Sequence, residues 1–319
     1  METVLVTGGA GFIGCNIAEA LLNKGHRVVV LDDLSSGKME NIAHHSANEA
    51  FTFYRGSILD SGLVRTIFQK HKISCISHQA AVASVTKSIQ DPVMTSSVNV
   101  IGTINLFSLA AEYKCKRIVF ASSCAIYGDT RLLPIKETVP VNAKSPYAAS
   151  KAADELFAGA FHSLYGVRII GLRYFNVYGR RQDPASDYAA VIPIFIAKAL
   201  ANEKIPIDGD GMQTRDFIYI DDVVQANIKA LMKEDVADSA FNVAVGRETS
   251  ITELAKVIVA TAGSRSEIVH LPARAGDIRN SHADIESARK NLGFSPEYTI
   301  EQGLRETVKW YREQSNQVK

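Results

Sequence analysis

The chain has 319 residues, 46% of them hydrophobic and 22% charged, with a formal net charge of +1. This composition is typical of a globular protein, and the length suffices for one large domain or two interlocked ones. A charge this close to zero offers no electrostatic basis for binding nucleic acid or an anionic membrane, so we expect neither as a partner. No apolar run approaches roughly 20 residues, so we expect no segment that spans a bilayer.

The four cysteines are scattered along the chain and form no C-x-x-C pair. We therefore expect reduced thiols in a cytoplasmic protein, and no metal site. The N-terminus enters a strand-like segment at once, without the basic region and cleavage site of a signal peptide. This agrees with the cytoplasmic location that we expect.

Short β-branched runs alternate with helix-length segments through the first half of the chain. The expected strands are TVLVTG, HRVVVLDD, FTFYRGSI, CISHQAA, RIVFASS and VRIIGLRY. The expected helices include residues 12–24, 98–113 and 147–164. Because the strands are almost entirely apolar, the pattern predicts an α/β fold with a doubly wound parallel sheet of Rossmann type.

The alternation stops near Asn176, where loops rich in Pro, Gly and Asp begin. One more strand-like run, AFNVAVG, and terminal helices follow. We expect a doubly wound domain made of residues 1–175 with 225–246. A smaller C-terminal substrate lobe would comprise residues 176–224 with 247–319.

The stretch TGGAGFIG lies between the first expected strand and the first expected helix. The spacing of Gly8, Gly11 and Gly14 lets the backbone turn tightly and approach a pyrophosphate at the helix N-terminus. Asp32 closes the second strand, where a carboxylate can bind a ribose diol and repel a 2′-phosphate. The pattern predicts a site for NAD in preference to NADP.

The stretch SPYAASK places Tyr147 and Lys151 at i and i+4, on one face of a helix. Ser145 is the expected N-cap of this helix and Pro146 its first residue. A tyrosine normally titrates near ~10, so a tyrosine base at neutral pH needs a stabilised phenolate. An adjacent ammonium and a positively charged nicotinamide would supply that stabilisation.

Five segments occur together and in order: the glycine loop, SSCAIYG, SPYAASK, RYFNVYG and RDFIYIDD. With them the chain resembles the extended short-chain dehydrogenase/reductase family. Within it, the chain is similar to nucleotide-sugar 4-epimerases, above all to those acting on UDP-N-acetylhexosamines. The resemblance extends from the glycine loop beyond the RAGD segment at 274–277.

The resemblance implies an NAD-dependent enzyme that interconverts UDP-GlcNAc and UDP-GalNAc through a 4-keto intermediate. The doubly wound domain would bind NAD, and the lobe would bind the UDP-sugar. The helices near 98–113 and 147–164 resemble the pair that forms a four-helix dimer interface in this family. A homodimer is therefore expected.

The resemblance also implies roles for individual residues. Tyr147 would take the proton of the sugar O4 hydroxyl, Lys151 would hold the nicotinamide ribose and Ser123 would hydrogen-bond O4. The positions expected at the cofactor, besides Tyr147 and Lys151, are Gly8, Gly11, Phe12, Ile13, Gly14, Asp32, Ser57, Ile58, Ala80, Asn99 and Phe175. The positions expected at the substrate are Ala83, Ser84, Ser123, Cys124, Asn176, Gln182, Ala190, Arg215, Arg274, Asp277 and Ser281.

Among the substrate positions, Asn176, Arg215 and Arg274 match those that hold the UDP diphosphate in the family, and Asp277 matches one near the uridine ribose. Paired arginines suit a diphosphate because each offers a planar fork of donors. Ser57 is a departure from the family, which usually has an aspartate there that reaches the adenine amino group.

The residues after Ser123 distinguish between reactions of the family. Dehydratases resemble this chain but carry a carboxylic acid and a carboxylate beside the catalytic Ser/Thr, and UDP-glucuronate decarboxylases carry a glutamate nearby. Cys124 and Ala125 occupy these positions here and cannot serve as such an acid or base. An epimerase, which needs no further acid or base, is therefore favoured.

One position distinguishes the epimerases that accept plain hexoses from those that accept 2-acetamido sugars. In the resembling epimerases a gatekeeper lies four residues after the aspartate of R-x-G-D, where a bulky aromatic restricts the pocket to plain hexoses. Ser281 holds this position and favours a 2-acetamido sugar, although Ala83 replaces the glycine often found in that branch. A UDP-glucose or UDP-uronate 4-epimerase and a catalytically silent NAD-binding regulatory protein remain the alternatives.

Overall fold

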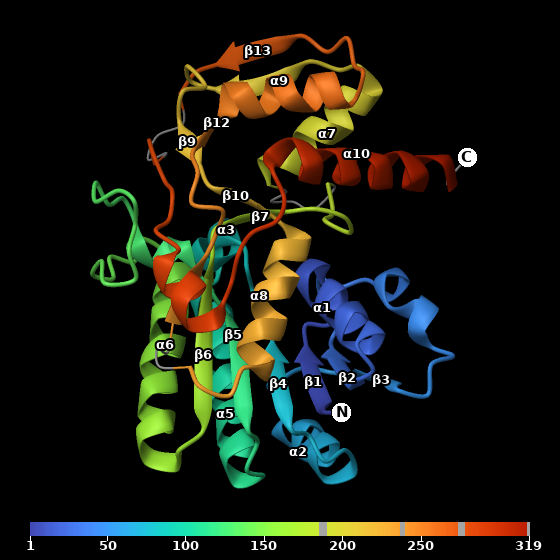
Figure 1. The fold of residues 1–319 in the computed structure, drawn as a ribbon, viewed down its shortest axis with the longest axis vertical. Helices are drawn as coiled ribbons and strands as arrows, with labels where there is room; N and C mark the ends of the chain where they lie inside the picture. The colour runs from blue at the N-terminus through green and yellow to red at the C-terminus, as the bar shows by residue number, and fades with distance from the viewer. Residues whose placement is uncertain (185–189, 237–239, 274–277, 318–319) are drawn as a thin grey trace.

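A computed structural model describes residues 1–184, 190–236, 240–273 and 278–317. Within these residues, seven parallel strands form the main sheet, in the spatial order β11-β6-β5-β4-β1-β2-β3. The strands are β1 (Thr3–Thr7), β2 (Arg27–Asp32), β3 (Phe51–Arg55), β4 (Cys75–His78), β5 (Arg117–Ser123), β6 (Arg168–Tyr174) and β11 (Ala240–Val243). The predicted Rossmann-type α/β fold is confirmed (Figure 1).

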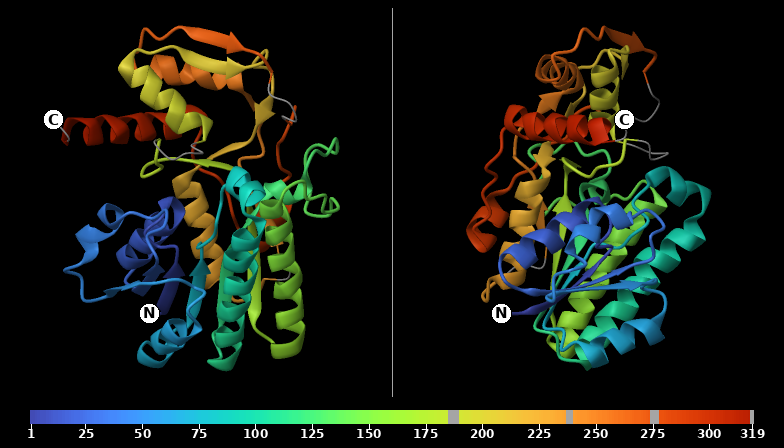
Figure 2. Two further views of the ribbon diagram at one scale, coloured as in Figure 1. Left: turned by 180° about the vertical axis from the view of Figure 1, so that it is seen from behind. Right: turned by 90° about the vertical axis from the view of Figure 1, so that its right-hand side faces the viewer.

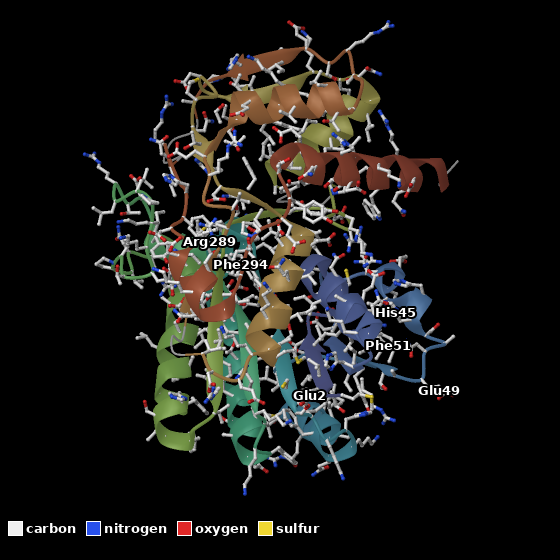
Figure 3. All side chains as sticks on the ribbon, in the orientation of Figure 1. Glu2, His45, Glu49, Phe51, Arg289 and Phe294 are labelled. Carbon is white, nitrogen blue, oxygen red and sulfur yellow. The ribbon has the colours of Figure 1, made fainter. Side chains whose placement is uncertain are left out.

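Helices cover both faces of this sheet, which explains why its strands are apolar on both sides (Figure 2). One face carries α1 (Phe12–Asn23) and α8 (Ile220–Met232), and the other carries α2 (Ser61–Lys70), α5 (Gly102–Glu112) and α6 (Pro146–Tyr165). Successive residues of β1 enter different cores: Val4 and Val6 lie in the first and Leu5 in the second. Side chains fill the space between the layers (Figure 3).

The order of the strands places a switch point between β1 and β4. The chain runs outward from β1 through β2 and β3 on one side, and from β4 through β5 and β6 on the other. Ligands of such folds bind outside the carboxyl ends of the strands at this point. The end of β1 leads into the glycine loop, and β5 ends at Ser123.

The helix α6 begins with the predicted cap and ends one residue beyond the predicted Leu164. The Ser145 hydroxyl accepts a hydrogen bond from the Ala148 backbone N–H at 3.1 Å, and Pro146 is the first helical residue. Gly166 ends the helix in the left-handed conformation, with φ of 70°. Both ends of the element that carries Tyr147 and Lys151 are therefore set by local chemistry.

Short helices connect the main elements. They are η1 (Met39–Asn41), η2 (Ala43–His45), α3 (Val85–Gln90), α4 (Pro92–Ser96), η3 (Ser97–Ile101), η4 (Cys124–Tyr127) and η5 (Ala288–Leu292). The helix expected over 98–113 begins as the π-helical turn η3 and continues as α5.

A second layer of small sheets lies beyond the carboxyl ends of the main strands (Figure 1). Its strand pairs are β7 (Asn176–Tyr178) with β10 (Phe217–Tyr219), β9 (Thr214–Arg215) with β12 (Thr249–Ser250), and β8 (Ile205–Asp208) with β13 (Ile268–Leu271). Its helices are α7 (Val191–Ala201), α9 (Ile251–Thr261) and α10 (Ile300–Gln317). The boundary expected at residue 224 falls inside α8, and the proposed division into two domains stays a prediction.

One helical stretch within the described residues, Pro92–Glu112, is long and apolar enough to cross a membrane by length and composition alone. Of its most apolar window, 44% is buried inside the protein. This is weak evidence for a membrane span, because a core helix passes the same test.

Candidate active site

The glycine loop requires glycine at two positions for steric reasons. Gly8 has a φ of +66°, and a Cβ there would lie 2.6 Å from the Ala80 backbone nitrogen. A Cβ at Gly14 would lie 2.1 Å from the Gly8 carbonyl oxygen. Gly11 caps α1 without a side chain, so the first N–H groups of the helix are free of a side-chain cap. This cradle suits a dinucleotide pyrophosphate.

Asp32 lies at the carboxyl end of β2, where the sequence predicts a partner for a ribose. Its carboxylate accepts hydrogen bonds from the backbone N–H groups of Ala10 at 2.9 Å and Leu34 at 2.8 Å. Burial raises the pKa of Asp32, and these two N–H groups oppose that effect. Gly37 lies against the carboxylate, since a Cβ there would be 2.8 Å from Oδ1. A site for a ribose diol therefore fits these residues.

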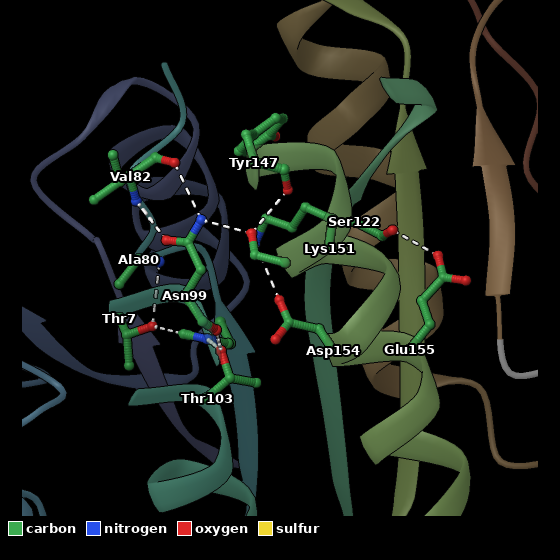
Figure 4. A network of polar contacts seen from close by, with 12 residues as sticks. Thr7, Ala80, Val82, Asn99, Thr103, Ser122, Tyr147, Lys151, Asp154 and Glu155 are labelled. Carbon is green, nitrogen blue, oxygen red and sulfur yellow. Dashed lines mark hydrogen bonds and ion pairs between the residues drawn. The ribbon is translucent and has the colours of Figure 1, made fainter. Parts of the chain in front are cut away.

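Asn99 ties the loop after β4 to the rest of the site. Its amide oxygen accepts from the Val82 N–H at 2.7 Å, and its amide nitrogen donates to the Ser150 hydroxyl at 2.9 Å (Figure 4). Asn99 is fully buried. It positions the loop that carries Ala80, and its predicted contact with a cofactor stays a prediction.

Other positions predicted for the cofactor lie around this loop and the α1 N-terminus. Phe12 and Ile13 are partly buried in the first turn of α1. The Ser57 hydroxyl accepts from the Leu59 N–H at 3.2 Å. Ile58 is buried and contacts the α5 backbone, because a Cβ at Gly102 would be 2.6 Å from its Cδ1.

Ser123 and Tyr147 come together from β5 and α6. Ser123, the last residue of β5, accepts from the Ala125 N–H at 3.2 Å and is almost fully buried. Burial raises the pKa of the Tyr147 hydroxyl to about 12, and a hydrogen bond with the Ser123 side chain opposes this rise. The predicted pair of hydroxyls is therefore brought together by the tertiary structure.

Lys151 extends inward from α6 and is 2% exposed. Its Nζ lies 3.5 Å from Oδ2 of Asp154, which is buried as well. His78 lies between the hydroxyls of Thr7 at 2.6 Å and Thr103 at 2.9 Å. Burial, with Lys151 nearby, lowers the pKa of His78 to about 3, so this ring is neutral and structural.

Ser122 faces away from Ser123 and belongs to a separate network, as the alternation of a strand requires. Its hydroxyl donates to Glu155 Oε1 at 2.6 Å. The same carboxylate binds Arg173 of β6, with a distance of 2.6 Å between Oε2 and Nη2. This network fastens β5, β6 and α6 to one another behind the reacting groups.

Two side chains next to the reacting groups are unsuited to proton transfer. Cys124 follows Ser123 at the start of η4, and burial raises the pKa of its thiol to about 12. Phe175 is buried in an apolar cluster with Tyr127, whose ring centroid is 6.5 Å away. Neither adds an acid or a base to the site.

The positions predicted for the substrate are distributed over the loops and the second layer. Asn176 donates to the Asp216 carbonyl oxygen at 3.2 Å, and Arg215 donates to the carbonyl oxygens of Thr214 at 2.8 Å and Ile278 at 2.7 Å. The Gln182 amide donates to the Val177 carbonyl oxygen at 3.3 Å. Ser84 caps α3, Ala83 and Ala190 are exposed, and Ser281 is buried. Arg274 and Asp277 lie outside the described residues.

Three acidic residues near the site, two of them buried and Glu155 partly buried, were not predicted from the sequence. Asp154 supports Lys151, Glu155 binds Arg173, and Asp216 accepts backbone N–H groups of Val245, Gly246 and Ala283. A signal existed for Asp154, because it falls on the helical face that Tyr147 and Lys151 share. Asp216 lies within the RDFIYIDD segment, but its backbone partners are distant in the sequence.

The arrangement suits the oxidation of an alcohol. The Ser123 hydroxyl, the Tyr147 phenol and the Lys151 ammonium lie at the carboxyl edge of the sheet. The glycine cradle contacts the loop that follows β4 and carries Ala80. A phenolate so placed can remove the proton of a secondary alcohol.

Comparison with known proteins agrees with this geometry. Residues 5–307 match the family model described as GDP-mannose 4,6 dehydratase. The chain is 40% identical to a putative UDP-glucose 4-epimerase of Methanocaldococcus jannaschii over 310 residues, which cover 97% of this chain and 98% of that protein.

Two solved structures are also similar. One is the UDP-N-acetylglucosamine 4-epimerase of Methanobrevibacter ruminantium in complex with UDP-N-acetylmuramic acid, with 40% identity and a TM-score of 0.92 over 98% of this chain and 99% of that one. The other is the UDP-glucose 4-epimerase of Thermus thermophilus in complex with NAD, with 36% identity and a TM-score of 0.87 over 97% of this chain and 99% of that one. The chain therefore belongs to the extended short-chain dehydrogenase/reductases of the GDP-mannose dehydratase type, in their nucleotide-sugar 4-epimerase branch.

Proposed function

We propose that this protein, an NAD-dependent UDP-sugar 4-epimerase, interconverts UDP-GlcNAc and UDP-GalNAc. The observation that carries the choice of sugar is Ser281, a small buried residue at the gatekeeper position. A small side chain leaves room for a 2-acetamido group, which an aromatic ring would exclude. The similarity to the M. ruminantium UDP-N-acetylglucosamine 4-epimerase supports this choice.

The cofactor of this reaction is NAD. When bound, it supplies the carbon to which the C4 hydride of the sugar passes and from which it returns. The glycine cradle at Gly8, Gly11 and Gly14 would hold its pyrophosphate, and Asp32 a ribose diol. Lys151 would hold the nicotinamide ribose hydroxyls. The steric demand for glycine at Gly8 and Gly14 supports this assignment.

Tyr147 would act as the general base. Its phenolate would take the proton of the sugar O4 hydroxyl, while Ser123 hydrogen-bonds O4. The positive charge of Lys151 would stabilise the phenolate in this reaction. After the 4-keto sugar has turned about its diphosphate link, Tyr147 would return the proton to O4 on the other face.

The absence of a further acid beside Ser123 supports epimerisation over elimination. The thiol of Cys124 is held neutral by burial, and Ala125 has no polar group. Neither can protonate a leaving hydroxyl or remove a second proton. The 4-keto sugar would therefore have no route but reduction on either face.

The lobe residues would bind the UDP portion. Asn176 and Arg215 are placed on β7 and β9, and Arg274 completes the expected set. Arginines suit this task because their forks bind phosphate oxygens at two points. The carbonyl contacts of Arg215 would keep its guanidinium aligned with the diphosphate.

A homodimer is part of this proposal. Large apolar side chains are exposed along α3, α4, η3 and α6: Val85, Ile89, Val93, Met94, Ile101, Leu156, Phe157 and Leu164. An exposed apolar face of this kind marks an interaction site. A second copy presenting the same helices would cover it by forming a four-helix bundle.

The second candidate is a UDP-glucose 4-epimerase, favoured by the similarity to the putative M. jannaschii enzyme and to the T. thermophilus enzyme. One experiment separates the two. The purified protein is incubated without added NAD with UDP-GlcNAc, UDP-glucose or UDP-glucuronate, and the anomeric signals are followed by NMR.

We expect conversion of UDP-GlcNAc, and release of NAD when the protein is denatured. Turnover of UDP-glucose or UDP-glucuronate alone would contradict the choice of sugar. Bound NAD with no turnover of any of the three would favour a regulatory protein over an enzyme.

A further inference from the structure

A buried carboxylate lies directly behind the Tyr147–Lys151 pair. Asp154 follows Lys151 by three residues and Tyr147 by seven, so the three side chains share one face of α6. The side chain of Asp154 is 1% exposed and that of Lys151 is 3% exposed. Figure 4 shows Asp154 on the side of Lys151 away from Tyr147.

The contacts of Asp154 involve one of its two oxygens. Oδ2 lies 3.5 Å from Lys151 Nζ, whereas Oδ1 has no hydrogen-bond partner within the described residues. The hydroxyl of Thr103 donates to the Asn99 carbonyl oxygen, and its proximity to Asp154 also lowers the pKa of that carboxyl. A carboxylate buried for structural reasons alone would have both oxygens satisfied, because an unpaired buried oxygen costs stability. Its partner of consequence is therefore Lys151.

The titratable and charged groups around Asp154 are Lys151, Tyr147 and Glu155 on α6, His78 on β4 and Arg173 on β6. Of these, His78 is neutral, and α5 contributes a hydroxyl, that of Thr103. Glu155 is paired with Arg173. Lys151 and Asp154 thus form a buried pair on the helix that carries Tyr147, and the negative charge of Asp154 raises the pKa of the Tyr147 phenol.

We propose that Asp154 is a positioning residue that holds the Lys151 ammonium from behind and moderates the positive charge it presents to Tyr147. This rests on the proposed function, in which Tyr147 is the base. An epimerase removes a proton from O4 and gives it back, so its base must release a proton as readily as it takes one. An unopposed ammonium would favour the phenolate too strongly and slow the return of the proton.

The direction of the effect follows from the charges. An ionised Asp154 raises the pKa of Tyr147, and removal of its charge lowers that pKa. Burial raises the pKa of Asp154 itself to about 6, with Lys151 opposing the rise. The moderating charge is therefore present above about pH 6 and is lost as the pH falls through this value.

The test is Asp154→Asn in the full chain with its NAD. Two quantities are measured: kcat for the UDP-sugar as a function of pH, and the titration of Tyr147 by NMR in protein labelled with 13C at the tyrosine Cζ. Tyr147→Phe assigns the signal. We expect the acid limb of kcat and the Tyr147 titration both to move to lower pH, by about one unit.

Two further variants sharpen the result. Asp154→Glu restores the charge and should return both titrations toward the wild-type values. Glu112→Gln removes an exposed carboxylate on α5 and should leave both unchanged. If Asp154→Asn does not fold, Asp154→Ser removes the same charge and is tested in the same way.

Folded variants without the charge whose two titrations stay in place would overturn the inference, and so would a move to higher pH. The second result would mean that Asp154 acts by keeping Lys151 charged. A wild-type protein without epimerase activity would contradict the proposed function instead, and the NMR titration would still test the effect of Asp154 on Tyr147.

Discussion

Tyr147, Lys151 and Asp154 are spaced so that the periodicity of α6 alone puts them on one face. What each of them can do depends on its surroundings. Tyr147 borders Ser123, Lys151 is enclosed by the protein, and the Asp154 carboxylate lies 3.5 Å from the Lys151 ammonium. At the scale of residues, the chemistry of the site depends on three neighbouring titratable groups and their burial.

The role of Tyr147 predicts the behaviour of Tyr147→Phe. Loss of the hydroxyl removes the base, so kcat should fall by about 10²–10⁴-fold, while NAD stays bound. The anomeric NMR signals of the UDP-sugar measure turnover. The absorbance of the NAD released on denaturing the protein measures how much NAD was bound. Tyr113→Phe, at the C-terminus of α5, is the control and should retain activity. Near-normal turnover in Tyr147→Phe would remove Tyr147 from the mechanism.

The gatekeeper role of Ser281 predicts a change of specificity in Ser281→Tyr. A ring at this buried position would fill the space for the acetamido group, so the ratio of kcat/KM for UDP-GlcNAc to that for UDP-glucose should fall by about tenfold or more. Ser281→Ala, which keeps the position small, should leave the ratio near its original value. Equal losses for both sugars in Ser281→Tyr would contradict the assignment.

At the scale of elements, the site depends on how α6 is fastened to β5 and β6. Glu155 of α6 accepts from Ser122 of β5 and pairs with Arg173 of β6, and the Arg173 guanidinium lies 5.1 Å from the Tyr127 ring centroid. Burial lowers the pKa of the Arg173 guanidinium, but its hydrogen bonds with Glu155 raise that pKa further, to well above the ordinary value. Arg173 therefore stays charged. The network holds Ser123 and Tyr147 near each other. Ser123 follows Ser122 in the chain, and Tyr147 lies about two helical turns before Glu155 on α6.

Glu155→Gln tests this fastening. The change leaves a buried guanidinium without its counter-charge, so the free energy of unfolding should fall by about 3 kcal/mol. Urea unfolding at neutral pH measures it. Glu112→Gln breaks the exposed pair with Arg65 and should cost far less. Equal losses in the two variants would mean that the buried network does not stabilise the protein more than a surface pair.

At the scale of the whole molecule, the main sheet and the second layer meet at the carboxyl ends of the strands (Figure 1). This is where the switch point between β1 and β4 lies and where β5 delivers Ser123. The apolar side chains on α3, α4, η3 and α6 are exposed to solvent.

The dimer proposal predicts that Leu156→Lys yields monomers. Leu156 is 77% exposed on α6, and a buried ammonium at a two-fold interface would oppose its own copy. Sedimentation velocity should show a dimer for the wild type and a monomer for the variant. Leu271→Lys, on β13 of the second layer, should remain dimeric. A monomeric wild type would contradict the proposal.

Local patterns were sufficient for the elements around the site. The strand RIVFASS and the helix from Pro146 have the predicted positions, because apolar periodicity, a serine cap and a proline act over a few residues. The second layer was not predictable in the same way. Its strands have two to four residues, and β8 pairs with β13 across some sixty residues of chain. Such pairs depend on burial in the assembled fold and leave no local signal.

By itself, the sequence determined the doubly wound fold, the glycine loop and the spacing of Tyr147 and Lys151, since each follows from short-range backbone geometry and side-chain periodicity. The tertiary structure alone decided that Ser123 meets Tyr147, that His78 is neutral and that the Asp154 carboxylate lies 3.5 Å from Lys151. Those facts depend on burial and on charges from separate elements, because the pKa of a group is set by the neighbours that folding brings to it.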